Sequence, residues 1–141
     1  MKVSNILQTK SSNVFSVSSQ ATVYDALILM GEKNIGALLI IDGDKLAGIL
    51  SERDYARKII LKGKTSHDTL VKEIMTENPF TIGPNDSIET CMALMSEKHF
   101  RHLPVVQDGI AVGMISIGDV VKAIIKMQKE TIDHLQNYIS Q

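Results

Sequence analysis

The chain has 141 residues, of which 44% are hydrophobic and three are proline, so it can form one domain or two small subdomains that share a core. Fifteen basic and sixteen acidic residues give a formal net charge of −1, which argues against a nucleic-acid-binding protein with a large basic surface. The longest wholly apolar run, Ala37–Ile41, is far shorter than the roughly 20 residues of a membrane-spanning helix.

The first half of the chain predicts a short lead-in helix followed by a β-α-β-β-α unit. The helix of the unit is expected to begin after Thr22, because Asp25 lies three residues later, as in a capping box. The polar Gly turn 42–45 between two apolar runs predicts a β-hairpin. In chain order the predicted elements are a lead-in helix at 3–7, strands at 14–17, 37–41 and 46–50, and helices from Thr22 and over 54–61.

The second half of the chain predicts the same order of elements. A polar linker, 63–68, separates the halves. The predicted elements are a lead-in helix at 71–75, strands at 80–82, 103–106 and 111–115, a helix after Ser87, a turn at 107–109, and a last helix from Asp119 onward. We therefore divide the chain into a first repeat with its lead-in, 1–66, and a second repeat with an extended last helix, 67–141.

The two halves are copies of one sequence unit. Residues 14–60 align with 79–125 at a constant offset of 65, whereas the lead-in segments align at an offset of 68, which places a three-residue insertion near 10–13. Apolar identities are expected of any two like cores, but the polar spacing Gly-x-x-Ser-x-x-Asp also recurs. It occurs as Gly48, Ser51 and Asp54 and as Gly113, Ser116 and Asp119. This repetition predicts two like units that stack on each other.

The last helix continues past the end of its counterpart in the first repeat. Val121, Ile125, Ile132, Leu135 and Ile139 follow roughly 4-3 spacing, interrupted by Gln128. Two interpretations stay open. The apolar edge packs against a second subunit, or the helix folds back over its own sheet.

The segment Ser51-Glu52-Arg53-Asp54 combines groups that suit a nucleotide at a strand-to-helix junction. Free backbone N–H groups at a helix start favour an anion. Arg53 offers a planar fork that matches a phosphate, and Asp54 can accept two hydrogen bonds, as a ribose diol would supply. Ser116 and Asp119 repeat this design without the arginine. The alternative is that each Ser-x-x-Asp is only an N-cap.

The segment Lys98–Pro104 is basic and aromatic, whereas its counterpart in the first repeat, 33–39, has no arginine, histidine or aromatic residue. Phe100 could stack on a base and Arg101 could contact a phosphate; the alternative is a surface turn with a solvated arginine. His99 and His102 have no nearby carboxylate or cysteine to complete a metal site, so no metal is expected. We find no catalytic constellation and expect no enzyme.

The single cysteine and the N-terminus favour a cytoplasmic location. Cys91 cannot form an intramolecular disulfide, and Met1–Asn5 lacks the apolar core of a signal peptide. Because Cys91 falls on an apolar helical face, we expect it to be a buried small hydrophobe.

Taken together, these patterns resemble the CBS domain family, named for cystathionine β-synthase. The resemblance covers about Val3 to Met127. It rests on the two Gly-x-x-Ser-x-x-Asp segments, on Arg101–Val106 and on Lys72–Thr76. It implies an α+β fold in which two β-α-β-β-α repeats pack sheet to sheet about a pseudo-twofold axis, as in a Bateman module. It also implies two clefts between the repeats that bind AMP, ADP, ATP, NAD or S-adenosylmethionine, and a homodimer.

The resemblance also implies which residues face each cleft. The aspartate of each motif would take the ribose hydroxyls, and the serine would lie near ribose or phosphate. The first cleft would contain Ser51, Arg53, Asp54, Asn78, Phe80, Phe100 and Arg101, and the second would contain Ser116, Asp119, Asn13, Phe15, Ile35 and Gly36.

The two clefts are not expected to be equivalent. Gly118 stands where the first repeat has Arg53, and Gly36 stands where the second repeat has Arg101. We therefore expect the Asp54 cleft to be the better phosphate site. The predicted function is a non-catalytic adenine-nucleotide-sensing module that regulates an unidentified protein. The alternative is a structural or interaction module with no nucleotide.

Overall fold

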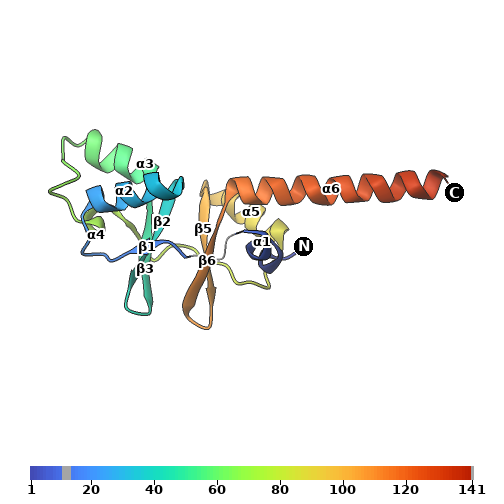
Figure 1. Cartoon of the computed structure of the whole chain (residues 1–141), viewed down its shortest axis with the longest axis horizontal. Helices are drawn as coiled ribbons and strands as arrows, with labels where there is room; N and C mark the ends of the chain where they lie inside the picture. The colour runs from blue at the N-terminus through green and yellow to red at the C-terminus, as the bar shows by residue number, and fades with distance from the viewer. Residues whose placement is uncertain (11–13, 141) are drawn as a thin grey trace.

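The computed structural model describes residues 1–10 and 14–140. Two small α/β units lie side by side, and a long C-terminal helix extends beyond the second one (Figure 1). The first half of the chain forms α1 (Val3–Thr9), β1 (Ser16–Val17), α2 (Val23–Lys33), β2 (Ala37–Asp42), β3 (Lys45–Ser51), α3 (Glu52–Tyr55) and a π-helical turn η1 (Ala56–Ile60). The second half forms α4 (Val71–Ile74), β4 (Thr76–Glu77), α5 (Ile88–Lys98), β5 (His102–Gln107), β6 (Ile110–Ser116) and α6 (Ile117–Ser140).

Each unit is built on one antiparallel hairpin with the same register. Ala37 pairs with Ser51 in β2–β3, and His102 pairs with Ser116 in β5–β6. β1 adds to β2 in parallel and β4 adds to β3, which gives the order β1-β2-β3-β4. The strand expected at 80–82 is reduced to a single parallel bridge from Ile82 to Val105. The α+β class and the duplicated order of elements are confirmed.

Local sequence signals explain where the helices begin. The hydroxyl of Thr22 accepts from the backbone N–H of Asp25 at 3.1 Å, and that of Ser87 accepts from Thr90 at 3.1 Å, so both predicted N-caps are confirmed. The helix expected from Asp54 begins earlier, at Glu52. Because Ser51 is the N-cap and bonds Asp54 at the third helical position, the helix must start directly after the serine.

Two hydrophobic clusters form the core, one in each unit. The cluster of the first unit consists of Val23, Ala26, Met30, Leu38, Ile40, Leu50, Ile59, Val71 and Ile74. That of the second unit consists of Val3, Ile6, Ile82, Ile88, Cys91, Met95, Leu103, Val105, Ile115, Val120 and Ala123. Cys91 is fully buried, as expected, and burial raises the pKa of its thiol to about 11.

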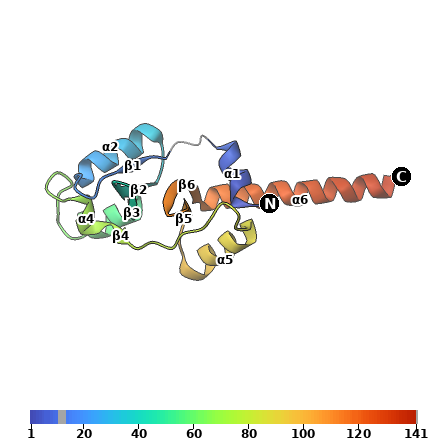
Figure 2. The ribbon, with the colours of Figure 1, turned by 90° about the horizontal axis from the view of Figure 1, so that it is seen from below.

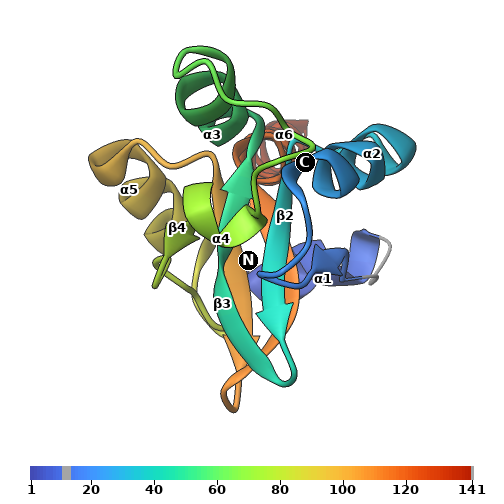
Figure 3. The ribbon, with the colours of Figure 1, turned by 90° about the vertical axis from the view of Figure 1, so that its left-hand side faces the viewer.

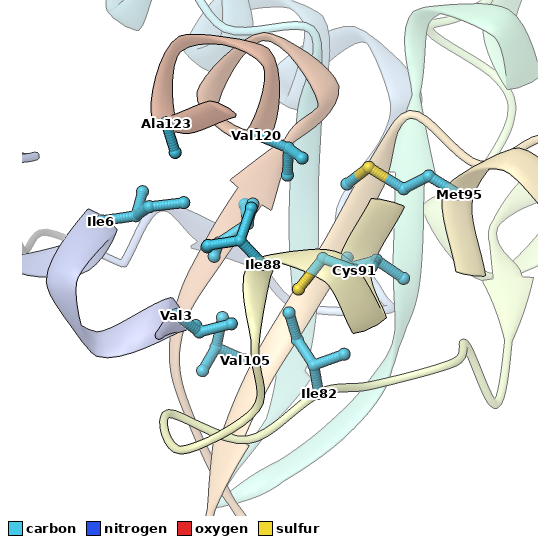
Figure 4. Packing of buried hydrophobic residues seen from close by; sticks show 11 residues of the cluster. Val3, Ile6, Ile82, Ile88, Cys91, Met95, Val105, Val120 and Ala123 are labelled. Atoms are coloured by element: carbon cyan, nitrogen blue, oxygen red, sulfur yellow. The ribbon is translucent and has the colours of Figure 1, made fainter. Parts of the chain in front are cut away.

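The lead-in helices are exchanged between the two units. Val3 and Ile6 of α1 pack into the second cluster, beside Ile88 and Val105 (Figure 4), and Figure 2 shows α1 next to β6 and α6. Conversely, Val71 and Ile74 of α4 pack into the first cluster. Each lead-in helix therefore packs in the core of the other unit: α1, which precedes the first unit, packs in the second core, and α4, which precedes the second unit, packs in the first. The division at 66/67 had placed each lead-in helix with the unit that it precedes.

The last helix does not fold back over its own sheet. Val120 and Ala123 anchor its start, but every residue from 128 to 140 is exposed. The helix points away from both units (Figure 1), so the apolar edge at Ile125, Ile132 and Leu135 faces solvent within the chain.

Candidate functional site

The carboxylate of Asp54 is held at the end of β3 by the capping box. Its Oδ2 accepts from the backbone N–H of Ser51 at 3.0 Å and from the Ser51 hydroxyl at 3.1 Å, while the hydroxyl accepts from the Asp54 N–H at 3.2 Å. The predicted N-cap is therefore real. It fixes the carboxylate, and Lys58 Nζ lies 3.4 Å from its Oδ1.

Lys58 does not bind Asp54 alone. Its ammonium donates to the carbonyl oxygen of Ile74, in α4, at 2.8 Å. This bond links η1 to the exchanged lead-in helix, and it holds the lysine at a distance from Asp54 that is long for a charge-assisted hydrogen bond. The sequence analysis did not identify Lys58.

Asp54 opens onto a cavity of about 720 Å³, a size typical of small-molecule sites. The cavity lies between the ends of the two hairpins, which contact each other through β3 and β6. The two hairpins lie one behind the other in the view of Figure 3. Its lining includes all seven residues expected at the first cleft: Ser51, Arg53, Asp54, Asn78, Phe80, Phe100 and Arg101. The other lining residues were not predicted from the sequence as part of this cleft, among them Glu52, Arg57, Glu77, Lys98 and His102.

An aromatic pair forms part of the cavity wall. The ring centroids of Phe80 and Phe100 lie 5.5 Å apart with an angle of 41° between the planes. Phe100 is held against the second core, whereas Phe80 is 48% exposed. Lys98 Nζ lies 5.5 Å from the centroid of Phe80. The pair offers a firm apolar surface on which a flat ring can pack.

The cavity also gathers charge of both signs, with the cations in slight excess. The positive residues are Arg53, Arg57, Lys98 and Arg101, and the negative ones are Glu52, Asp54 and Glu77.

Burial lowers the pKa of His102, and the nearby charges of Lys10 and Arg101 lower it further against the opposing effect of Asp119. His102 is therefore a neutral imidazole at neutral pH.

Two of the residues expected at the second cleft, Ile35 and Gly36, line cavities beside the first motif. Gly36 lines the Asp54 cavity, because the hairpin register brings it beside Glu52, whose N–H donates to its carbonyl at 3.0 Å. Ile35 borders both the first core and a second cavity, between α2 and α3. Phe15 packs on the first core, and Lys33 Nζ lies 5.3 Å from its ring centroid. Asn13 lies outside the described residues.

At the second motif, the capping contacts are repeated. Asp119 Oδ2 accepts from the Ser116 N–H at 2.8 Å, and the Ser116 hydroxyl accepts from the Asp119 N–H at 3.1 Å. The same Oδ2 also lies 2.7 Å from Lys10 Nζ. Burial would raise the pKa of Asp119, but the hydrogen bonds from Lys10 and Ser116 outweigh this effect and lower it.

Lys10 is the residue that sequence reasoning missed at this motif. The lead-in offset of 68 places Lys10 opposite Asn78, a residue of the first cleft. The offset of 68 could therefore have identified Lys10 as the counterpart of Asn78. The offset of 65, which applies after the insertion near 10–13, pairs Asn78 with Asn13 instead.

Among residues 1–10 and 14–140, no group of three or more His, Cys, Asp and Glu side chains could hold a metal ion. Over the same residues, no helix is both long enough and apolar enough to cross a membrane.

Comparison with known proteins supports a duplicated family domain. The chain matches the CBS domain over residues 3–61 and again over 71–126. It is 43% identical over 123 residues to "CBS domain-containing protein CBSX3, mitochondrial" of Arabidopsis thaliana; the match covers 84% of this chain and 60% of that relative, less than two thirds of its length. A CBS-domain protein of Burkholderia ambifaria has 48% sequence identity and a TM-score of 0.86, over 89% of this chain and 95% of that chain.

Two similar solved structures contain adenosine compounds. CBSX2 in complex with AMP is 28% identical, with a TM-score of 0.75 over 90% of this chain and 98% of that chain. The CBS domain pair of MJ0100, in complex with 5′-methylthioadenosine and S-adenosyl-L-methionine, is 25% identical, with a TM-score of 0.80 over 90% and 98%. Two consecutive matches, a duplicated fold and these neighbours lead to one conclusion: the chain belongs to the CBS domain family, as a tandem pair.

Proposed function

We propose that this chain is a non-catalytic regulatory module that binds an adenine nucleotide, AMP, ADP, ATP or NAD, in the Asp54 cavity. One observation carries the proposal: a single cavity joins a fixed carboxylate, an aromatic pair and two arginines that lie far apart in the sequence. These are the groups that the ribose, the base and the phosphate of a nucleotide need. The AMP and S-adenosylmethionine complexes of similar CBS pairs support the same ligand class.

The expected contacts follow from the geometry of the cavity. The ribose diol donates to Asp54, whose capping contacts lie on Oδ2 and whose Oδ1 lies 3.4 Å from Lys58 Nζ. The adenine ring packs on the surface formed by Phe80 and Phe100. The phosphate meets Arg53 and Arg101, each of which offers a planar guanidinium fork. Ligand thereby bridges the two units and favours one relative orientation of them, which a partner protein in the cytoplasm reads.

Calorimetric titration of the intact chain tests this function. Wild-type protein is titrated with AMP, ADP, ATP, NAD and S-adenosylmethionine, with GMP as the base control. Asp54→Asn keeps the capping geometry but halves the acceptor capacity of the carboxylate, so it should weaken binding by tenfold or more. Lys45→Ala, at the exposed start of β3, is the matched surface control and should bind as the wild type does. If none of these compounds binds, the result would favour the alternative, an interaction module that has no nucleotide ligand.

A specific observation also supports a homodimer formed through α6. The apolar edge of the helix is exposed, with Ile125 58%, Ile132 53% and Leu135 57% accessible. Residues spaced four and three apart form the seam of a two-stranded coiled coil. We infer that a second copy covers this edge, and the truncation experiment in the Discussion tests that inference.

A further inference from the structure

Lys58 contacts the motif carboxylate of the first unit from outside the Asp54 cavity. Of the described residues, those that line the cavity include Asp54 and Arg57 but not Lys58. The Nζ atom of Lys58 nevertheless lies 3.4 Å from Asp54 Oδ1, and the Asp54 side chain is only 14% exposed. Lys58 can therefore act on a molecule in this cavity through the carboxylate, without contacting that molecule itself.

The two oxygens of Asp54 have partners on different elements. Oδ2 accepts the N–H and the hydroxyl of Ser51, whereas the ammonium of Lys58 lies near Oδ1. The terminal torsion of an aspartate is broad, so contacts at one oxygen do not fix the plane of the carboxylate. A diol needs that plane in a defined orientation, because both of its hydroxyls must reach acceptor lone pairs. The charge of Lys58 beside Oδ1 supplies the second restraint.

The ammonium of Lys58 is itself anchored on the first core. It donates to the carbonyl oxygen of Ile74 at 2.8 Å, and Ile74 is 1% exposed in α4. β4 begins two residues later, at Thr76, and the chain then reaches Asn78 and Phe80, which line the cavity. Lys58 therefore ties the carboxylate to the base of the segment that forms another part of the cavity wall.

A π-helical turn brings Lys58 to this place. The N–H of Leu61 donates to the carbonyl oxygen of Ala56, five residues earlier, at 3.2 Å. At the repeat offset of 65, Lys58 aligns with Ala123, which is 7% exposed in the second core, but in the first unit the buried residue is the next one, Ile59, at 2%. This shift by one residue lets position 58 carry a lysine that reaches α4. Single π-helical turns are frequent at functional sites.

We propose that Lys58 is a positioning residue of the nucleotide site, which holds the Asp54 carboxylate in the orientation that accepts the two ribose hydroxyls. This inference rests on the proposed function, since it assumes that the Asp54 cavity binds AMP. An ion pair that is partly exposed corresponds to about fivefold in affinity. Loss of the ammonium should therefore weaken the ribose contact by about fivefold and leave the contacts of the base and the phosphate in place.

The test is calorimetric titration of the full chain with AMP and with 2′,3′-dideoxyadenosine monophosphate. The second compound lacks both ribose hydroxyls and keeps the base and the phosphate, so the ratio of the two affinities measures the hydroxyl contact. Lys58→Met should lower this ratio about fivefold, by weakening the binding of AMP and not that of the dideoxy compound. Lys62→Met, in the exposed turn after η1, is the matched control and should leave both affinities unchanged.

A double variant tests whether Lys58 acts through the carboxylate. In the Asp54→Asn background the charge that Lys58 holds is already absent, so adding Lys58→Met should weaken AMP binding no further. A further fivefold loss in the double variant would overturn the inference, because Lys58 would then act on the ligand independently of Asp54.

The remaining outcomes are equally decisive. Equal losses for the two compounds in Lys58→Met would show that the lysine acts on the phosphate or on the fold of the cavity, and unchanged or tighter AMP binding would show that it does not position the carboxylate. Either result overturns the inference and leaves the proposed function standing. Lys58→Gln replaces Lys58→Met if the melting temperature shows that the latter does not fold. If the wild type binds no nucleotide, the proposed function fails, and this inference fails with it.

Discussion

A Cβ atom built at Gly48 would lie 2.5 Å from the carbonyl oxygen of Thr76. Gly48 pairs with Glu77 across β3 and β4, so the exchanged lead-in segment runs directly over the glycine. In the second unit a Cβ at Gly113 would meet a different obstacle, the side chain of Leu7 in α1, at 2.8 Å. The glycine of each motif thus leaves room for the lead-in segment that comes from the other repeat.

Gly48→Ala should destabilise the chain by roughly 1–3 kcal/mol, because backbone atoms must shift to make room for the methyl group. Urea denaturation followed by circular dichroism measures the effect. Gly113→Ala should cost less, since its obstacle is the end of a flexible side chain.

Gly31→Ala is the control for this series. Apart from the backbone of its own helix and its chain neighbours, no atom of the described residues lies within 4 Å of the added methyl group, and the site is inside α2. Alanine should therefore stabilise the helix by up to about 1 kcal/mol. A Gly48→Ala variant as stable as the wild type would contradict the close approach of β4.

Arg53 and Arg101 should both contribute to phosphate binding, although they come from different repeats. Replacing either by alanine should weaken AMP binding by about tenfold, and should weaken adenosine binding far less, because adenosine has no phosphate. Calorimetry with both ligands separates the phosphate from the nucleoside. Equal losses for AMP and adenosine would show that the arginines act on the fold of the cavity and not on the phosphate.

The lowered pKa of His102 predicts a loss of stability in mild acid. Below the ordinary histidine pKa of 6.5, the unfolded chain takes up a proton that the folded chain resists, so the free energy of unfolding falls as the pH falls. Urea denaturation at pH 7.5, 6.5 and 5.5 should show this decrease, and His102→Gln should flatten it.

His134→Gln, on the exposed part of α6, is the histidine control and should leave the pH dependence unchanged. The lowered pKa of Asp119 acts in a separate window, since its contribution is lost only as the pH falls below about 4. An unchanged slope in His102→Gln between pH 7.5 and 5.5 would rule out His102 as its source.

Removal of residues 128–141 should convert a dimer to a monomer and leave the two units folded. Residues 128–140 are exposed, so the truncation takes no core side chain away. Light scattering measures the mass, and the melting temperature reports on the fold. Leu135→Lys, in the full chain, should have the same effect on the mass, because it places a charge in the proposed seam. A truncated chain that stays dimeric would exclude α6 as the main contact.

Much of the fold follows from short-range patterns. The hairpins follow from polar Gly turns between apolar runs, and the helix starts follow from Thr22, Ser51 and Ser87 as N-caps. The family resemblance also grouped Asn78, Phe80, Phe100 and Arg101 with Asp54, and all of them line one cavity. The placement of Gly36 was not foreseen, because it depends on the hairpin register that brings it next to Glu52.

The sequence alone determined that this protein is a duplicated β-α-β-β-α pair with a small polar motif at the end of one hairpin in each copy. It determined this because local periodicity, caps and turns repeat at a fixed spacing. Only the tertiary structure decided which lead-in helix enters which core, and therefore that Lys10 reaches Asp119 across more than a hundred residues of sequence. Such a contact leaves no local pattern, because it depends on how two similar lead-in helices are distributed between two similar cores.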